Sequence, residues 1–116
     1  MNEFVLIFRT DCLAEVKFSP NEMQSIMQHW QNWIGSIAAQ NKLANTGNRL
    51  GSNGATLKPG NVISNGPYTE IKEIITGYII IRAESIDEAA KVAKGCPLVV
   101  GGEGQVEVRN IIPMNG

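Results

Sequence analysis

A short polar segment at residues 65–73, Asn-Gly-Pro-Tyr-Thr-Glu-Ile-Lys-Glu, carries side chains that could take part in chemistry. Asn65 and Gly66 tolerate positive φ, and Pro67 fixes its own φ and donates no hydrogen bond. We therefore expect a rigid turn that presents Tyr68, whose hydroxyl can donate and accept hydrogen bonds. Asn65, Gly66, Pro67 and Tyr68 are our candidate substrate-binding residues, although a plain connection between two strands is the more frequent use of such a sequence.

His29 is the only histidine of the chain and our candidate catalytic residue. Histidine readily exchanges a proton near neutral pH, so it could carry a proton to or from a substrate. It lies on the flank of a predicted helix, on the same side as Trp33, which sits at the edge of the apolar stripe and could line a cleft. Trp30 belongs to the stripe itself and should pack in the core. A lone histidine is more often a surface or packing residue, so the structural interpretation stays open.

Other reactive residues do not form a recognisable metal or cofactor site. Cys12 and Cys96 are far apart in sequence, and with one histidine they fall short of the four paired ligands of a usual zinc site. We expect Cys96 to be a buried small hydrophobic residue. The glycine-rich segment at residues 101–104 does not lead from a strand into a helix, so it is not a dinucleotide fingerprint. We therefore expect no metal and no cofactor.

Length and charge limit the kind of protein further. A chain of 116 residues is expected to form one domain over residues 1–116, large enough for its own core. Its net charge is −1, and it has no cluster of basic residues, which argues against nucleic-acid binding. The apolar run at residues 4–8 is too short for a signal peptide or a membrane span. We expect a cytoplasmic protein.

Hydrophobic periodicity and capping signals predict an α+β fold. Ser19 and Ser85 each precede a helix and have a glutamate three residues later, as in a capping box. The predicted elements are a strand at 4–8, a helix at 20–41, a weak hairpin of 55–57 and 62–63 around Pro59-Gly60, a strand at 77–83, a helix at 86–94 and a strand at 106–112. This order is that of a ferredoxin-like sandwich, with an antiparallel sheet and two helices on one face.

Both faces of this sheet carry apolar residues. Along the predicted strand at 4–8, Phe4, Leu6 and Phe8 alternate with Val5 and Ile7. Along the predicted strand at 77–83, Ile79 and Ile81 alternate with Tyr78 and Ile80. Two helices can cover only one face, so a partner chain is the economical cover for the other. The pattern predicts a homodimer packed sheet against sheet.

Several segments together resemble the YCII-related family, in particular its Asp-Gly-Pro-Phe branch. The matching residues are Asn65 to Glu70 with Lys72-Glu73, Gly77-Tyr78, Glu88-Ala89-Ala90, Gly95-Cys96-Pro97, Val106 to Arg109, and the pair Trp30 and Trp33. This resemblance covers nearly the whole chain. It implies a dimeric α/β barrel with a cleft into which the turn and the first helix project.

The resemblance also implies two kinds of function. Some YCII-like proteins are thought to pair a histidine of the first helix with the aspartate of the turn as acid and base, and one relative is a lyase-type enzyme acting on a chlorinated aromatic compound. The branch is often associated with sigma factors of the extracytoplasmic type. Here the motif aspartate is Asn65, which cannot act as a general base, the motif phenylalanine is Tyr68, and the family histidine falls on Trp30, next to His29.

Two hypotheses follow for this chain. In the first, it binds a small, aromatic or anionic, ligand in a cleft and carries out weak acid–base catalysis of the lyase type. His29 would then carry the proton, while Asn65 and Tyr68 would orient the substrate. In the second, it is a non-catalytic binding or regulatory module, linked to sigma-factor regulation, that kept the fold and lost the acid.

Overall fold

The computed structural model describes residues 1–11, 18–66 and 73–114 of the chain. Pro67, Tyr68 and Cys12, which the sequence analysis singled out, lie outside these residues. The elements in chain order are β1 (Asn2–Asp11), α1 (Pro20–Ala39), β2 (Leu43–Arg49), β3 (Ala55–Lys58), β4 (Val62–Asn65), β5 (Glu73–Ala83), α2 (Ile86–Ala93), α3 (Pro97–Val100) and β6 (Gly104–Asn110).

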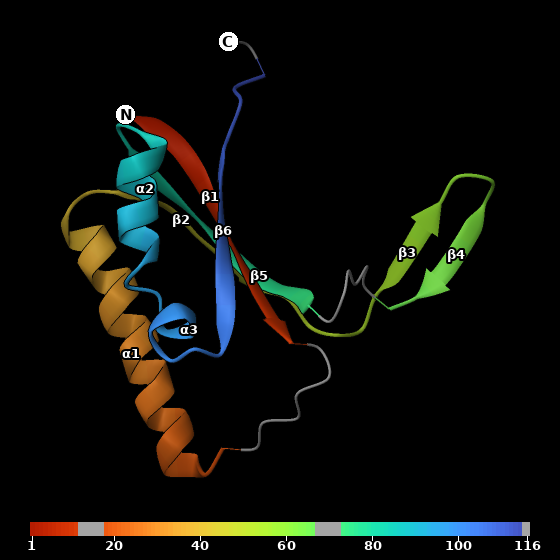
Figure 1. Cartoon of the computed structure of the whole chain (residues 1–116), viewed down its shortest axis with the longest axis horizontal. Coiled ribbons are helices and arrows are strands. Elements are labelled where there is room, and N and C mark those ends of the chain that lie inside the picture. Colours follow the sequence, from red (N-terminus) through yellow and green to blue (C-terminus); the bar gives the residue numbers. More distant parts are fainter. Residues whose placement is uncertain (12–17, 67–72, 115–116) are drawn as a thin grey trace.

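Four of the strands form one antiparallel sheet in the order β2-β5-β1-β6, and α1 and α2 cover one of its faces (Figure 1). Because β5 lies between β2 and β1, and β1 lies between β5 and β6, each helix connects two strands that are not neighbours. This split arrangement is that of a ferredoxin-like α+β fold, as predicted.

The two main helices begin where their capping residues predicted. The amide of Glu22 donates to Ser19 Oγ and the amide of Ser19 donates to Glu22 Oε1, both at 3.2 Å, so the capping box of α1 is complete. Ser85 accepts from the amide of Glu88 at 3.2 Å and starts α2. Lys42, just after α1, lies 2.9 Å from a carboxylate oxygen of Glu88, which links the end of one helix to the start of the other.

The sequence analysis missed β2. Residues 43–49 are mostly polar, because this strand is the edge of the sheet and is interrupted by a bulge. At the bulge Gly47 has φ of 64° and its amide donates to Asn45 Oδ1 at 2.7 Å. A Cβ at Gly47 would overlap the carbonyl oxygen of Tyr78, so only glycine fits there. A polar edge strand of this kind has no regular apolar alternation to recognise.

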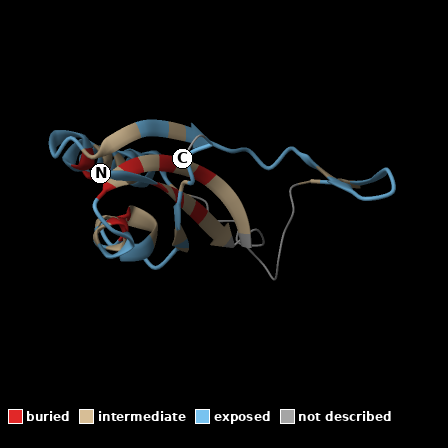
Figure 2. Cartoon of the chain, turned by 90° about the horizontal axis from the view of Figure 1, so that it is seen from above, coloured by how far each residue is buried: buried red, intermediate tan, exposed pale blue. Residues whose placement is uncertain are grey.

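The predicted hairpin exists, but its place in the fold was wrong. β3 and β4 pair only with each other, as a separate two-stranded sheet inserted between β2 and β5. Gly60 and Asn61, with φ of 85° and 62°, make the turn beside Pro59. This hairpin, which we call the arm (residues 55–65), extends away from the sheet and helices in both views (Figures 1 and 2).

The core lies between the sheet and the helices. Buried side chains of β1 and β5 meet α1 and α2 there, and the set is Phe4, Leu6, Phe8, Trp33, Ile37, Ile79, Ile81, Ala83, Ala89, Ala93 and Cys96. We predicted that Trp30 would be the more buried of the two tryptophans, but the reverse holds. Trp33 is only 8% exposed, whereas Trp30 is partly buried. Helix α1 approaches the sheet through its C-terminal half, while Met23 and Met27 near its start remain exposed.

None of the described helices covers the other sheet face (Figure 1). Val5, Ile7, Tyr78 and Ile80 share this open face, because the pairs Val5–Ile80 and Ile7–Tyr78 stand directly opposite each other. All four are partly buried by their sheet neighbours. An apolar strip along an open face is what the alternation in the sequence predicted.

Candidate functional site

A groove of about 550 Å³ lies between α1 and the segment that runs from the end of α2 to the start of β6. Its lining residues are Ile26, His29, Trp30, Asn32 and Trp33 on one wall and Gly95, Pro97, Leu98, Val100, Gly101 and Glu103 on the other. The volume is within the range of small-molecule sites. Because most of the lining is apolar, the groove suits a flat hydrophobic molecule.

Three aromatic rings make the inner wall of the groove, the wall formed by α1, rigid. Trp30 and Trp33 contact each other edge to face with centroids 5.7 Å apart, and Phe8 of β1 meets them at 5.0 and 6.0 Å in the same manner. The indole Nε1 of Trp33 donates to the carbonyl of Val92 at 3.1 Å, which fixes the ring against α2. Trp33 is therefore both a core residue and part of the groove wall.

Gly95 makes room for this tryptophan. A Cβ at that position would lie 3.0 Å from Cδ1 and 3.1 Å from Nε1 of Trp33, closer than side chains ordinarily approach. Pro97 follows two residues later and starts the one-turn helix α3, which carries Leu98 and Val100 into the groove. The sequence Gly95-Cys96-Pro97 thus ends α2 and also shapes the outer wall of the groove, the wall opposite α1.

Two ionisable side chains line the groove from opposite walls. His29 comes from α1, and Glu103 comes from the turn between α3 and β6. The carboxyl carbon of Glu103 lies 3.8 Å from where a Cβ of Gly101 would be, so this side chain folds back over the turn. The sequence analysis missed Glu103, because it treated residues 101–104 only as a failed dinucleotide motif. A lone carboxylate in a glycine-rich turn gives no sequence signal until α1 is known to pack nearby.

The turn residues lie elsewhere. Asn65 ends β4, at the base of the arm, and neither Asn65 nor Gly66 is among the groove-lining residues. Figure 1 shows α1 and the arm on opposite sides of the molecule. Gly66 has φ of 86°, as a turn there required, and its amide donates to the carbonyl of Gly54 at 2.6 Å. The structure brings His29 and Trp33 together but does not bring Asn65 to them within one chain.

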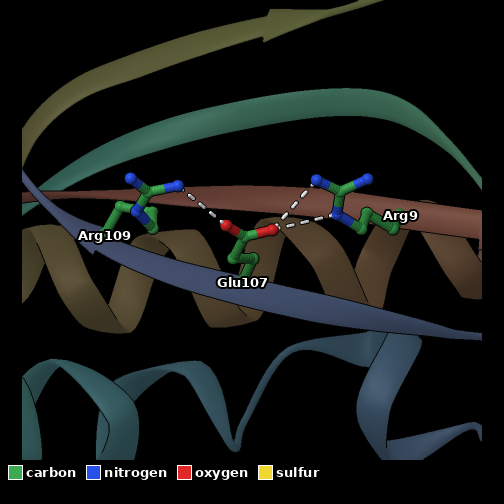
Figure 3. Close-up of polar contacts among 3 residues, drawn as sticks. All are labelled: Arg9, Glu107 and Arg109. Atoms are coloured by element: carbon green, nitrogen blue, oxygen red, sulfur yellow. Dashed lines mark hydrogen bonds and ion pairs between the residues drawn. The ribbon is translucent and has the colours of Figure 1, made fainter. Parts of the chain in front are cut away.

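A charged cluster lies on the open face of the sheet. Glu107 of β6 accepts from Arg9 of β1, with Nη2 at 2.9 Å, and from Nη1 of Arg109 at 3.2 Å (Figure 3). Hydrogen bonds from Arg109 and then Arg9 hold the pKa of Glu107 below its ordinary value. The three residues connect two neighbouring strands beside the apolar strip.

The remaining reactive residue is Cys96. It is fully buried, as predicted, and burial raises the pKa of its thiol. Among the residues that the structure describes, no three His, Cys, Asp or Glu side chains gather closely enough to hold a metal ion. The described helices include none long and apolar enough to cross a membrane.

The comparisons with known proteins identify the family. The model of the YCII-related domain matches residues 4–115, almost the full chain. The chain belongs to the YCII-related family. This confirms the family resemblance that the turn and its neighbouring segments predicted.

One solved structure similar to this YCII-related protein is 5-chloro-2-hydroxyhydroquinone dehydrochlorinase from Burkholderia phenoliruptrix, in complex with 2,5-dihydroxybenzoquinone. The two chains are 19% identical, the match covers 97% of this chain and 96% of the other, and the TM-score is 0.46. A comparison with curated proteins finds no match.

Proposed function

We propose that this YCII-related protein binds a small aromatic molecule in the groove between α1 and α3. The observation that carries the proposal is a groove of about 550 Å³ whose inner wall is made by two tryptophans. The lining residues that the structure describes include no lysine or arginine, and on this basis the proposal favours the aromatic over the anionic ligand. Edge-to-face contacts with indole rings suit a planar ring.

If the groove is also an active site, the reaction we propose is acid–base catalysis. His29 would carry the proton, and Glu103 on the opposite wall takes the role for which Asn65 lacks a carboxylate. A hydroxyl-bearing ring in the groove would have an imidazole on one side and a carboxylate on the other. This arrangement suits proton transfer in a lyase-type reaction.

The turn residues Asn65, Gly66, Pro67 and Tyr68 stay in the proposal as substrate-binding residues, and the two described ones, Asn65 and Gly66, are not among the groove-lining residues. Asn65 ends β4 in the arm, and the arm and α1 lie on opposite sides of the molecule (Figure 1), so a ligand held at the groove of the same chain would not reach Asn65. The proposal further includes membership of the Asp-Gly-Pro-Phe branch and pairing into a dimeric α/β barrel through the open face of the sheet.

Tryptophan fluorescence gives a direct test of binding, because the two tryptophans of the chain both line the groove. Three probes distinguish an aromatic from an anionic preference: phenol carries only a ring, acetate carries only a charge, and benzoate carries both. We expect a saturable change of emission with phenol and none with acetate. Val100→Arg should abolish the change, because Val100 lines the groove, whereas Val99→Arg should not, because the neighbouring Val99 does not. Equal responses of the two variants would reject the groove as the site.

A screen of hydrolase and lyase substrates tests catalysis. If the groove is an active site, His29→Ala and Glu103→Gln should each lower turnover by about 10²–10⁴-fold, the usual contribution of a general acid or base. Asn65→Ala should keep groove activity, since Asn65 lies outside it. Activity that depends on Asn65 and not on Glu103 would place the chemistry at the turn instead.

The second candidate is a non-catalytic binding or regulatory module, linked to sigma-factor regulation. Two observations favour it: Asn65 cannot replace the motif aspartate as a base, and His29 lines the groove whereas Asn65 does not. Saturable phenol binding without turnover of any substrate in the screen would favour this candidate.

A further inference from the structure

The arm has one apolar face that the described residues of the chain leave exposed. Leu57 and Ile63 stand directly opposite each other on one face, and Ala55 and Asn65 form the next pair on that face. Leu57 is 74% exposed and Ile63 is 65% exposed. Thr56, Ser64 and Lys58 belong to the other, mostly polar face. Such an amphipathic hairpin is built to lie on a surface.

The arm is too small to stand alone in water. It has two strands of four residues each, and an isolated two-stranded hairpin is marginally stable at best. Among the described elements, β3 and β4 make their substantial contacts only with each other. The hydrogen bonds at its base, from Gly66 to Gly54 and from Thr56 Oγ to Gly66, also stay within the arm and its stem. The described elements of the chain therefore give the arm no surface to pack on, and a second copy can supply one.

The size of the exposed surface agrees with the burial of part of this chain against a partner. The chain exposes 8350 Å², whereas a compact monomer of its mass is expected to expose about 6,200 Å². The difference of roughly 2,000 Å² exceeds the roughly 800 Å² that each partner of a standard protein interface buries. The radius of gyration, 15.7 Å, likewise exceeds the value of about 13.4 Å expected for a compact domain of this length.

The open face of the sheet is the matching surface. Its strip of Val5, Ile7, Tyr78 and Ile80 is apolar and has no helix over it. The arm extends away from this face in its own chain, so the two apolar surfaces do not meet there (Figure 2). Around a twofold axis, however, one contact made twice covers both surfaces on both chains. An unrelated partner would have to cover each of them separately.

We propose that the arm is exchanged between two copies of this chain that pair through their open sheet faces, with the Leu57–Ile63 face of each arm packed on the part of the other copy's open face that the contact between the sheets leaves free. This deepens the proposed dimer and rests on it. Asn65 lies on the same arm face as Ile63, so docking presents Asn65 of the partner subunit to the open face. The polar groups there include the Arg9–Glu107–Arg109 cluster and the Tyr78 hydroxyl, which accepts from Asn48 Nδ2 at 3.1 Å.

The exchange brings Asn65 of one copy to the open sheet face of the other. A ligand-binding region formed by Asn65 of one copy and the open sheet face of the other would be incomplete in a monomer. It would contain two arginines paired with one carboxylate, and so a net positive charge. Such a region suits a small anionic ligand, in contrast to the aromatic groove on the helix side.

Two neighbouring residues of β4 provide the test. Ile63→Asp places a charge on the apolar arm face, and Val62→Asp places the same charge on the opposite face, where Val62 is 50% exposed. In equilibrium sedimentation Ile63→Asp should weaken the dimer by about tenfold or more, as expected for an interface residue worth about 1.4 kcal/mol or more. Val62→Asp should leave the dimer close to the parent.

Cross-linking identifies the surface that the arm contacts. Copies carrying Leu57→Cys are mixed with copies carrying Ile7→Cys, both in a Cys12→Ser background, and treated with a short bismaleimide. We expect a covalent dimer of the two kinds of chain, and much less of it when Lys58→Cys replaces Leu57→Cys. A dimer that ignores Ile63→Asp and gives no such product would overturn arm exchange while leaving the dimer intact. A monomeric parent would reject both the dimer and the exchange.

Discussion

Gly66, directly after the arm, is a residue at which the backbone conformation favours glycine. Its φ of 86° is a conformation that other residues rarely adopt, although there is open space around it. Gly66→Val should therefore destabilise the fold by strain alone, by about 1–3 kcal/mol. Urea unfolding measures the change, and Gly51→Val, also in open space but without a positive φ, is the control. Equal stability of Gly66→Val and the parent would show that the turn does not need this conformation.

At Gly95 the limit is space rather than backbone conformation. Gly95→Ala would press a methyl group on Trp33 and should cost about 1–3 kcal/mol. It should also weaken phenol binding, because Trp33 forms the groove wall. Gly35→Ala is the control within α1, where nothing lies near the new methyl group, and it should stabilise the helix by up to about 1 kcal/mol. A Gly95→Ala protein with parental melting and phenol response would contradict this account.

At the scale of elements, the sequence predicted those that carry local signals. The capping serines and the apolar periodicity located α1 and α2, and the continuous apolar runs located β1 and β5. β2 was missed, because its pairing is set by its neighbour β5 and not by its own polar residues. The groove could not be predicted either, since it depends on how α3 packs beside α1. His29 and Trp33 were candidates from helix geometry, but Glu103 becomes one only in the folded chain.

The Arg9–Glu107–Arg109 cluster joins two of these elements, β1 and β6, and makes their pairing pH-dependent. Because the pKa of Glu107 is lowered by folding, its contribution to stability is present above the ordinary glutamate pKa of about 4.3. It is lost as the pH falls through the lower, folded-state pKa. In Glu107→Gln, the deficit in unfolding free energy relative to the parent should be largest near neutral pH and should shrink below about pH 4.

Urea unfolding of both proteins between pH 7 and pH 3 measures this deficit. It should also decrease in high salt, because the Glu107 side chain is one-third exposed. Glu3→Gln, an exposed glutamate of β1, is the control and should show a smaller deficit. A Glu107→Gln deficit that stays constant over the whole pH range would mean that the arginines do not stabilise the carboxylate.

At the scale of the whole molecule, the structure extends the argument for a dimer that began with the alternation of apolar residues. The helix face of the sheet is buried, and the open face carries an apolar strip beside a charged cluster. A chain this extended exposes more surface than a stable monomer of its mass normally does. We therefore predict twice the chain mass of 12.6 kDa in equilibrium sedimentation at micromolar concentration.

The variant that tests this prediction is Ile7→Asp, since Ile7 lies in the centre of the open face opposite Tyr78. A carboxylate buried there without a partner would be costly, so the dimer should dissociate. Ile112→Asp introduces the same change at a highly exposed residue beyond the end of β6 and should leave the dimer intact. Circular dichroism must show that both variants remain folded. If the Ile7→Asp protein is as dimeric as the parent, the two copies do not meet through the open face, and the barrel must be abandoned.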